Sequence, residues 1–288
     1  MNDSDRIAAV PSSFGMGRWN CNWRKASRGV RSLLGLPGSR DAAILSTFLH
    51  TLRRRLTEEL DSPVTSIAPA IFPLDRTKKR DFENALELAG LTSTVTRLGY
   101  DQIVYQDVNA AYAGLGRGLC KEWTDFLNCT YEEDILFYQD VLFLSFDNSS
   151  FATTIQTLGR AADGFTMAGY NLNLGLGWWN LPIDEVPRAR FWANIHEMII
   201  ATVSVLSRGP NAIVLMGEHG GDEEFRDVVE AALWSVLEMD VEMMLQANKG
   251  KDAGKLAARG AAEMAWRSQY WNRKDRERRI AAGGPVEL

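Results

Sequence analysis

The chain has 288 residues and a formal net charge of −5, and 45% of its residues are hydrophobic, a balance typical of a globular protein with a large apolar core. Its 37 acidic and 32 basic residues are spread along the whole length, which argues against nucleic acid as a partner. No apolar segment is long enough for a secretion signal or a membrane span, so we expect a cytoplasmic protein with no membrane partner.

The sequence indicates neither a disulfide nor a metal site. Cys21, Cys120 and Cys129 show no paired spacing, so we expect reduced thiols. The chain has 3 histidines, and none pairs with another histidine or a cysteine at metal-ligand spacing. We therefore expect no metal and no cofactor.

The first part of the chain begins without periodicity and then becomes helical. Residues 1–40 mix Gly, Ser, Arg and Pro with isolated aromatics and predict an irregular segment. From Asp41, a candidate N-cap, apolar residues recur at helical spacing as far as Leu60. The run Arg53–Arg55 falls mostly on the opposite face, which we expect to be solvated.

Strand and helix patterns then alternate. The β-branched run Val64–Phe72 predicts a buried strand, and Arg80–Leu91 predicts an amphipathic helix. A short strand is expected at Ile103–Tyr105, and a helix of small residues at Ala110–Gly116. This order is typical of an α/β fold.

The second half continues the alternation. Val141–Phe146 predicts a buried strand with Thr153–Leu158 as its hairpin partner, and a long helix is expected over Arg190–Leu206. The strand Ala212–Met216 precedes a helical stretch over Asp222–Ala247. Ligands of α/β folds bind beyond the carboxyl ends of strands, which points to the turns that follow the first and last of these strands.

Several segments, in the right order, resemble the ATPase domain of the seventy-kilodalton heat-shock chaperones. The first three resemblances lie before residue 115. Val64–Phe72 is similar to that family's "VITVPAYF" strand, and Ala89-Gly90-Leu91 to the "AGL" that ends the next helix. Gln106–Gly114 is similar to its first connecting helix, "NEPTAAAIAYG", where small side chains let two helices cross closely.

The later segments extend the resemblance. Val141–Ala152 falls where the family has its second phosphate loop, "DLGGGTFD", and Ile213–Gly217 resembles the strand before its adenosine loop. Leu256–Ala262 is similar to the second connecting helix, "AVAYGAA". The resemblance implies a reduced actin-like ATPase fold with two RNase H-like lobes, the outer subdomains being shortened or missing.

The expected organisation follows from that fold. We predict an irregular N-terminal segment and two α/β lobes, the second ending in the connecting helix, followed by a basic, mobile tail. The boundaries are 1–40, 41–140, 141–270 and 271–288.

The phosphate-handling positions depart from the family. Ser145 stands at the metal-associated Asp, Asp147-Asn148-Ser149 replaces the three glycines, and Ala152 replaces the closing Asp. Glycines let backbone N–H groups approach a phosphate closely, and Asp147 would repel one. Gly217 is kept, but acidic residues follow it. We therefore do not expect ATPase activity.

The first functional hypothesis is a cofactor-free enzyme that reuses this fold. Truncated relatives of the chaperone domain resemble proteins of filamentous fungi, some in natural-product pathways. A pericyclic, Diels–Alder-type cyclisation of an apolar small molecule needs only a shaped interlobe pocket and a hydrogen-bond donor. The candidate catalytic residues are His219, Glu218, Tyr112, Ser149 and Ser150, and the candidate pocket residues are Asp147, Trp178, Trp179 and Gly217.

Structural roles stand beside each of these assignments. The serines can simply complete a turn, Glu218 can cap a helix, and the indoles can be core residues among the chain's 9 Trp. The second hypothesis is a non-catalytic pseudo-ATPase that binds a protein partner or a second copy, through aromatics such as Trp266, Tyr270 and Trp271. The third is a divergent ATP-binding ATPase.

Overall fold

The computed structural model describes most of the chain and divides it into two compact units. The described residues are 36–72, 76–95, 104–163, 167–238, 241–246 and 252–281. The first unit contains the described residues up to Ile67 and those from 76 to Ser93, and the second contains 68–72 and the described residues from 94 onward. This division differs from the predicted boundary between 140 and 141, because the segment after residue 94 packs with the later part of the chain.

The first unit is a helical pair with a small sheet. Helix α2 (Arg40–Leu60) packs against α3 (Arg76–Leu88), and strand β1 (Ser66–Ile67) pairs in parallel with β3 (Thr92–Ser93). The N-cap of α2 is Ser39, whose hydroxyl accepts a hydrogen bond from the backbone of α2, so the predicted cap at Asp41 was two residues late.

Arg53 corrects the expectation of a solvated arginine run. Its guanidinium donates hydrogen bonds to the carbonyl oxygens of Val64 and Ala89, at 2.8 and 2.9 Å. It therefore ties α2 to the segments that follow α2 and α3. The prediction of one buried strand over Val64–Phe72 was also wrong, since this stretch forms two short strands and none of its residues is fully buried.

The second unit is built on a four-stranded sheet of order β7-β6-β5-β8. The first three strands form an antiparallel meander, and β8 lies parallel to β5. Their bounds are β5 (Gln139–Phe146), β6 (Phe151–Leu158), β7 (Met167–Asn173) and β8 (Ala212–Met216). The predicted hairpin and the predicted last strand are confirmed, whereas β7 was not predicted.

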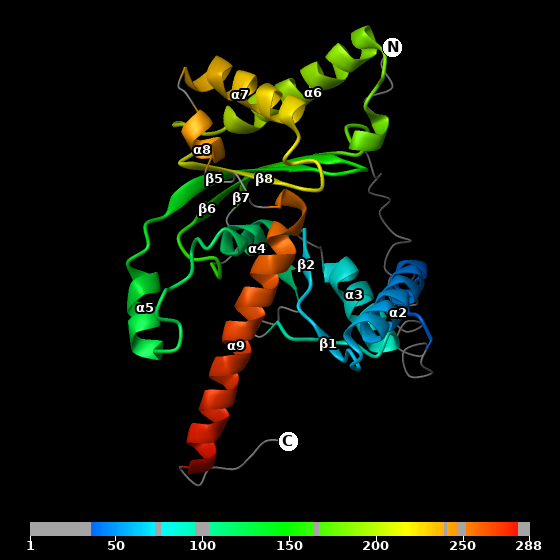
Figure 1. Ribbon diagram of the computed structural model, residues 1–288, viewed down its shortest axis with the longest axis vertical. Coiled ribbons are helices and arrows are strands. Elements are labelled where there is room, and N and C mark those ends of the chain that lie inside the picture. Colours follow the sequence, from blue (N-terminus) through cyan, green and yellow to red (C-terminus); the bar gives the residue numbers. More distant parts are fainter. Residues whose placement is uncertain are drawn as a thin grey trace, which may run out of the picture. The chain divides into compact units, whose positions relative to one another are not determined.

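Helices cover both faces of this sheet (Figure 1). One face carries α6 (Glu185–Val203) and α7 (Glu223–Leu237), and the other carries α4 (Asp107–Gly114) and α9 (Leu256–Ala281). Strand β2 (Ala70–Ile71) pairs in parallel with β4 (Tyr105–Gln106) just before α4. The unit is thus mixed α and β, as the sequence predicted.

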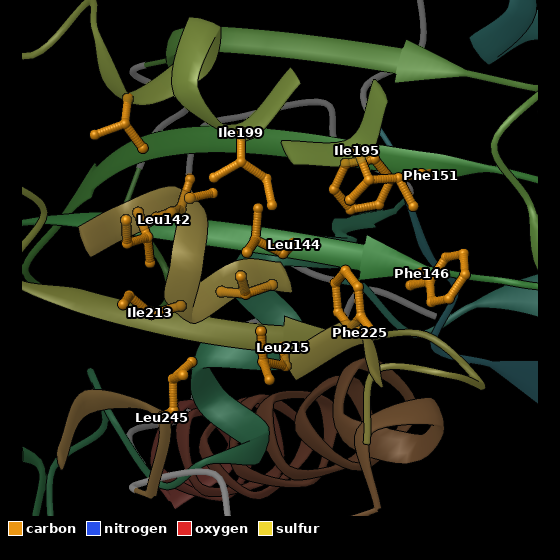
Figure 2. Close-up of a cluster of buried hydrophobic side chains, with 14 of the residues drawn as sticks. Leu142, Leu144, Phe146, Phe151, Ile195, Ile199, Ile213, Leu215, Phe225 and Leu245 are labelled. Carbon is orange, nitrogen blue, oxygen red and sulfur yellow. The ribbon is translucent and has the colours of Figure 1, made fainter. Parts of the chain in front are cut away.

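Alternation along the strands separates two cores. Leu142, Leu144 and Phe146 of β5 enter the cluster beneath α6 and α7, which Figure 2 shows. Val141 and Phe143 enter the cluster beneath α4 and α9. Because successive side chains point to opposite faces, the apolar run of β5 supplies both cores.

Helices α4 and α9 cross at two glycines. A Cβ on Gly260 of α9 would overlap the carbonyl oxygen of Ala110 in α4, and a Cβ on Gly114 would overlap the carbonyl oxygen of Leu256. Only glycine permits this approach. The resemblance implied a close helix crossing at α4, and the structure shows that its partner is α9.

Shorter helices complete the unit. They are α5 (Phe126–Asp134), α8 (Glu242–Gln246), η2 (Trp178–Asn180) and η3 (Ala253–Lys255). The tail expected from 271 is instead part of α9 as far as Ala281. Residues 1–35 and 282–288, which include most of the predicted irregular segment and the end of the predicted tail, lie outside the described residues.

A disulfide joins Cys120 and Cys129, which corrects the expectation of reduced thiols. The two cysteines are separated by 9 positions, and their Cα atoms are 5.0 Å apart because α5 turns back toward the loop that follows α4. Within the described part of the chain, no helix has the length and apolar character needed to cross a membrane.

Candidate functional site

A cavity of about 290 Å³ lies on the α4 side of the sheet, toward the carboxyl ends of β5 and β8. Its lining combines apolar and hydroxyl-bearing side chains with two carboxyl groups. The lining residues are Phe72, Asp107, Val108, Phe143, Ser145, Asp147, Ser149, Ser150, Ala152, Thr154, Tyr170, Leu172, Leu174 and Met216.

The strands build one wall of the cavity as two cross-strand rows. Strand pairing places Phe143 of β5 beside Thr154 of β6, and Thr154 beside Tyr170 of β7. The next row is Met216, Ser145, Ala152 and Leu172. Paired residues share a face of the sheet, so the register fixes these side chains on the cavity side.

Asp107 is the acid at the start of α4. It is the first residue of the helix, and one of its carboxyl oxygens accepts a hydrogen bond from the N–H of Val108 at 2.8 Å. Burial raises the pKa of Asp107 above its ordinary value, and the nearby carboxyl of Asp147 adds to the rise. Asp107 therefore holds its proton to higher pH than an exposed aspartate does.

Tyr170 brings a phenol to the same cavity from β7. Burial raises the pKa of its hydroxyl, and the neighbouring charge of Asp107 acts in the same direction. Its hydroxyl thus stays protonated and available as a hydrogen-bond donor beside Asp107.

Asp147 is fixed by the turn between β5 and β6. Ser145 donates its hydroxyl to one carboxyl oxygen at 2.8 Å, and the N–H of Glu218 donates to the other at 3.3 Å. The turn itself closes through the N–H of Asp147 and the carbonyl of Ser150, at 2.9 Å. Asp147 is therefore held in place rather than free to rotate.

No lysine, arginine or histidine is among the described residues that line the cavity. A phosphate group bound there would meet two carboxyl groups without a compensating side-chain cation. A cation would be attracted by the carboxyl groups. A neutral molecule with hydrogen-bonding groups would find hydroxyl and carboxyl partners. The cavity's chemistry therefore favours ligands that are not anionic.

Three of the residues predicted for the site line this cavity, namely Asp147, Ser149 and Ser150. The two serines also belong to the four-residue turn that joins β5 to β6, which is the alternative role that the sequence suggested for them. Gly217, after β8, has a φ of 86° and lies against the backbone of Phe146. It fits a close approach of two strand ends and is not part of the lining.

His219 and Trp178 pack on each other, next to the core beneath α6 and α7. Their rings stack with centroids 4.1 Å apart and planes at 7°. His219 Nε2 lies 3.0 Å from the side-chain oxygen of Asn148, whose amide group donates to Glu218. Trp178 also packs edge-on against Phe146. The group joins three loops, and none of its members lines the cavity.

The two remaining predicted residues lie elsewhere. Tyr112 is buried in the cluster beneath α4 and α9, where burial raises the pKa of its hydroxyl. Trp179 is 75% exposed. Neither side chain lines the cavity, although the N–H of Trp179 donates to the carbonyl oxygen of Asn148, the neighbour of Ser149, at 2.9 Å.

Sequence reasoning missed Asp107, Thr154 and Tyr170 as site residues. Asp107 stands inside the segment that resembles the first connecting helix. Because this helix begins directly after a strand, an acid at its first residue could have been expected near the ends of the strands. Tyr170 could not be found in this way, because its strand was not predicted. Ser145 was noted as a replaced position but not as a member of a pocket.

No protein-family model matches the chain, and a comparison with curated proteins finds no match.

Proposed function

We propose that this protein is a non-ATPase that binds a neutral or cationic organic molecule in the cavity at the carboxyl ends of β5 and β8. The observation that carries the proposal is the lining itself, in which Asp107 and Asp147 face the same space without a basic side chain among the described residues. An ATP phosphate would be repelled there, whereas a carbonyl, hydroxyl or amine would find donors and acceptors.

The enzyme we propose needs no cofactor. In its protonated form, which burial favours, Asp107 donates a hydrogen bond or a proton to a substrate carbonyl, and the Tyr170 hydroxyl is a second donor. Raising the pKa of a carboxyl group by burial is how proteins keep an acid available near neutral pH. A cyclisation or isomerisation of a small molecule held against Phe143 and Leu172 suits this arrangement, since orientation supplies much of the acceleration.

The resemblance to the actin-like ATPase fold supports the proposal without carrying it. The order β7-β6-β5-β8, a meander extended by a strand parallel to its first strand, is the order we expect of an RNase H-like lobe and supports that interpretation. The glycine crossing of α4 and α9 agrees with the two connecting helices of the resemblance. In the resemblance, Asp147 of the cavity lining takes the place of a glycine in the second phosphate loop.

Isothermal titration calorimetry with three probes tests the binding step. We expect the cationic probe phenethylamine to bind with a dissociation constant in the millimolar range or lower, which corresponds to a binding free energy of about −4 kcal/mol or more negative. The neutral probe 2-phenylethanol should bind more weakly. Magnesium ATP should give no heat of binding. Saturable binding of ATP at micromolar concentration, with neither small probe bound, would overturn the proposal in favour of a divergent ATPase.

A cavity-filling variant supplies the matched control. Ala152→Phe should abolish binding of phenethylamine, because Ala152 lines the cavity from β6, while circular dichroism shows that the fold is kept. Asp227→Asn, an exposed acid on α7, should leave binding unchanged. If neither phenethylamine nor 2-phenylethanol binds the folded wild type, the alternative of a non-catalytic module with a protein partner or a second copy takes precedence.

A further inference from the structure

The disulfide between Cys120 and Cys129 lies in a charge environment that differs at its two sulfur atoms. On one side, Nη1 of Arg267 lies 3.6 Å from Sγ of Cys120. The same nitrogen donates to the carbonyl oxygen of Cys120 at 2.7 Å. Arg267 is itself held by Glu263 at 2.8 Å and lies over the ring of Trp123. The guanidinium is therefore fixed beside one sulfur atom.

The other sulfur atom faces an acid. Oε1 of Glu133 lies 3.9 Å from Sγ of Cys129, and the two residues are one turn apart on α5. Burial raises the pKa of Glu133, while Arg160 and Arg267 act in the opposite direction. The two sulfur atoms and a carboxyl oxygen of Glu133 all lie within 4.8 Å of one another, so this acid is near both cysteines. Arg267 distinguishes them, because its guanidinium lies beside Cys120 and would stabilise a negative charge there.

The solvent exposure of the two cysteines also differs. Cys120 is 3% exposed, whereas Cys129 is half-buried on α5. An incoming thiolate therefore reaches Cys129 more easily. Thiol–disulfide exchange is faster when the attacked sulfur is accessible and when the departing thiolate is stabilised. Both conditions favour attack on Cys129 with Cys120 as the leaving thiolate.

We propose that Cys120–Cys129 is a thiol–disulfide exchange site, at which a small thiol of the glutathione class attacks Cys129 and releases Cys120 as a thiolate beside Arg267. The attacking R–S⁻ forms a new S–S bond to Cys129 as the Cys120–Cys129 bond breaks, and the electron pair of the broken bond stays on Cys120. A second thiol then releases Cys129 as a thiol and leaves as the oxidised disulfide of the reagent. This site is independent of the cavity.

Opening the disulfide affects the attachment of α5. None of the residues of α5 is buried, so the helix is held by few contacts. Besides the disulfide, these include the ion pair of Asp134 with Arg160 at 3.3 Å and the edge contact of Phe126 with Trp271 at 5.2 Å. Exchange should therefore loosen residues 121–134 and leave the sheet as it is.

The first experiment maps the adduct on a Cys21→Ser protein, since Cys21 lies outside the described residues. The oxidised protein is treated with limiting glutathione, quenched with acid, alkylated with N-ethylmaleimide and digested for mass spectrometry. We expect glutathione on Cys129 and the maleimide on Cys120. Equal amounts of adduct on both cysteines, or reaction only in denaturant, would overturn the proposal.

The second experiment tests the role of Arg267 through the rate of reduction by dithiothreitol. Arg267→Met should slow it about threefold to tenfold, because the departing thiolate loses its cation. Arg267→Lys should restore much of the rate, which a merely structural arginine would not predict. Arg273→Met, on the same helix and over Tyr270, is the matched control and should have no effect. Equal rates for Arg267→Met and wild type would contradict the assignment.

Hydrogen exchange measured before and after reduction tests the consequence for α5. Peptides from 121–134 should exchange faster after reduction, while those from β5 and β8 keep their protection. A change of the same size throughout the chain would mean that the disulfide stabilises the whole unit and is not a local exchange site.

Discussion

The two faces of the β7-β6-β5-β8 sheet are built from alternate residues of the same strands, yet they end differently. Beneath α6 and α7 the large side chains continue to the end of β5, where Phe146 is fully buried. Beneath α4 and α9 two helices cross closely at glycines, and Ser145 of β5 and Thr154 of β6 line a cavity. One face is closed by packing, and the other leaves space with hydrogen-bonding groups.

The groups that could bind a ligand lie on one face of the sheet. The α4 face contains the segments similar to the connecting helices and the acids of the cavity. The α6 face contains the stacked pair of Trp178 and His219, which sequence reasoning had assigned to the site. The predictions below test whether the two faces behave as differently as their packing indicates.

The largest effect is expected from Phe146→Ala on the closed face. Phe146 is fully buried and contacts Phe151, Phe225 and Trp192, so its truncation leaves a cavity and should cost about 3–5 kcal/mol of unfolding free energy. Urea denaturation measures the change. Phe137→Ala, at a side chain that is 86% exposed, is the control, with an expected change below about 0.5 kcal/mol.

A somewhat smaller effect is expected from Gly260→Ala, which tests the helix crossing on the open face. The added Cβ overlaps the backbone of α4, so the helices must separate, at a cost of about 3 kcal/mol or somewhat less. Gly221→Ala adds a Cβ with nothing within 4 Å and serves as the control in the same denaturation experiment. Equal stability of the two variants would mean that the crossing is looser than described.

A smaller effect on the unfolding free energy should distinguish the two adjacent tryptophans. Trp178→Ala removes the ring that packs on Phe146 and His219 and should cost about 2 kcal/mol, less than a fully buried Trp. Trp179→Ala, at a side chain that is 75% exposed, should cost less than about 0.5 kcal/mol. Thermal unfolding distinguishes the two. Loss of phenethylamine binding in Trp178→Ala, with stability unchanged, would restore Trp178 to the site.

The smallest effect on stability concerns Asp107 and depends on pH. Burial raises its folded-state pKa above the unfolded value of about 3.9, so the folded protein binds this proton more tightly than the unfolded chain. The unfolding free energy should therefore fall as pH rises from the unfolded pKa through the raised folded pKa. The charged and titratable groups facing Asp107 in the cavity are Asp147 and Tyr170.

Asp107→Asn removes this pH-dependent loss. The variant should gain stability relative to wild type as pH rises through that window, and the difference should level off above it. Denaturation midpoints at a series of pH values give the comparison, with Asp227→Asn, an exposed acid on α7, as the control. A constant difference at every pH would remove the pKa argument for Asp107 and weaken its proposed role as an acid.

The sequence predicted those strands and helices whose local residue pattern is sufficient to indicate them. The apolar runs at β5 and β8 predicted strands because each is buried on both faces, and β8 has the predicted bounds. Through the resemblance, the small residues of α4 indicated a close helix crossing, which the structure makes with α9 at Gly114 and Gly260. The mixed α/β class followed from the alternation of these elements.

Tertiary structure decided which side chains share a space. Register places Thr154 and Tyr170 beside Phe143, and α4 brings Asp107 to them, none of which a local pattern contains. The stacking of Trp178 on His219 and the disulfide likewise depend on loops that meet only in the folded chain. The sequence alone determined where β5, β6 and β8 end, but only folding decided which strand residues face a cavity, because side-chain direction depends on pairing and packing between distant segments.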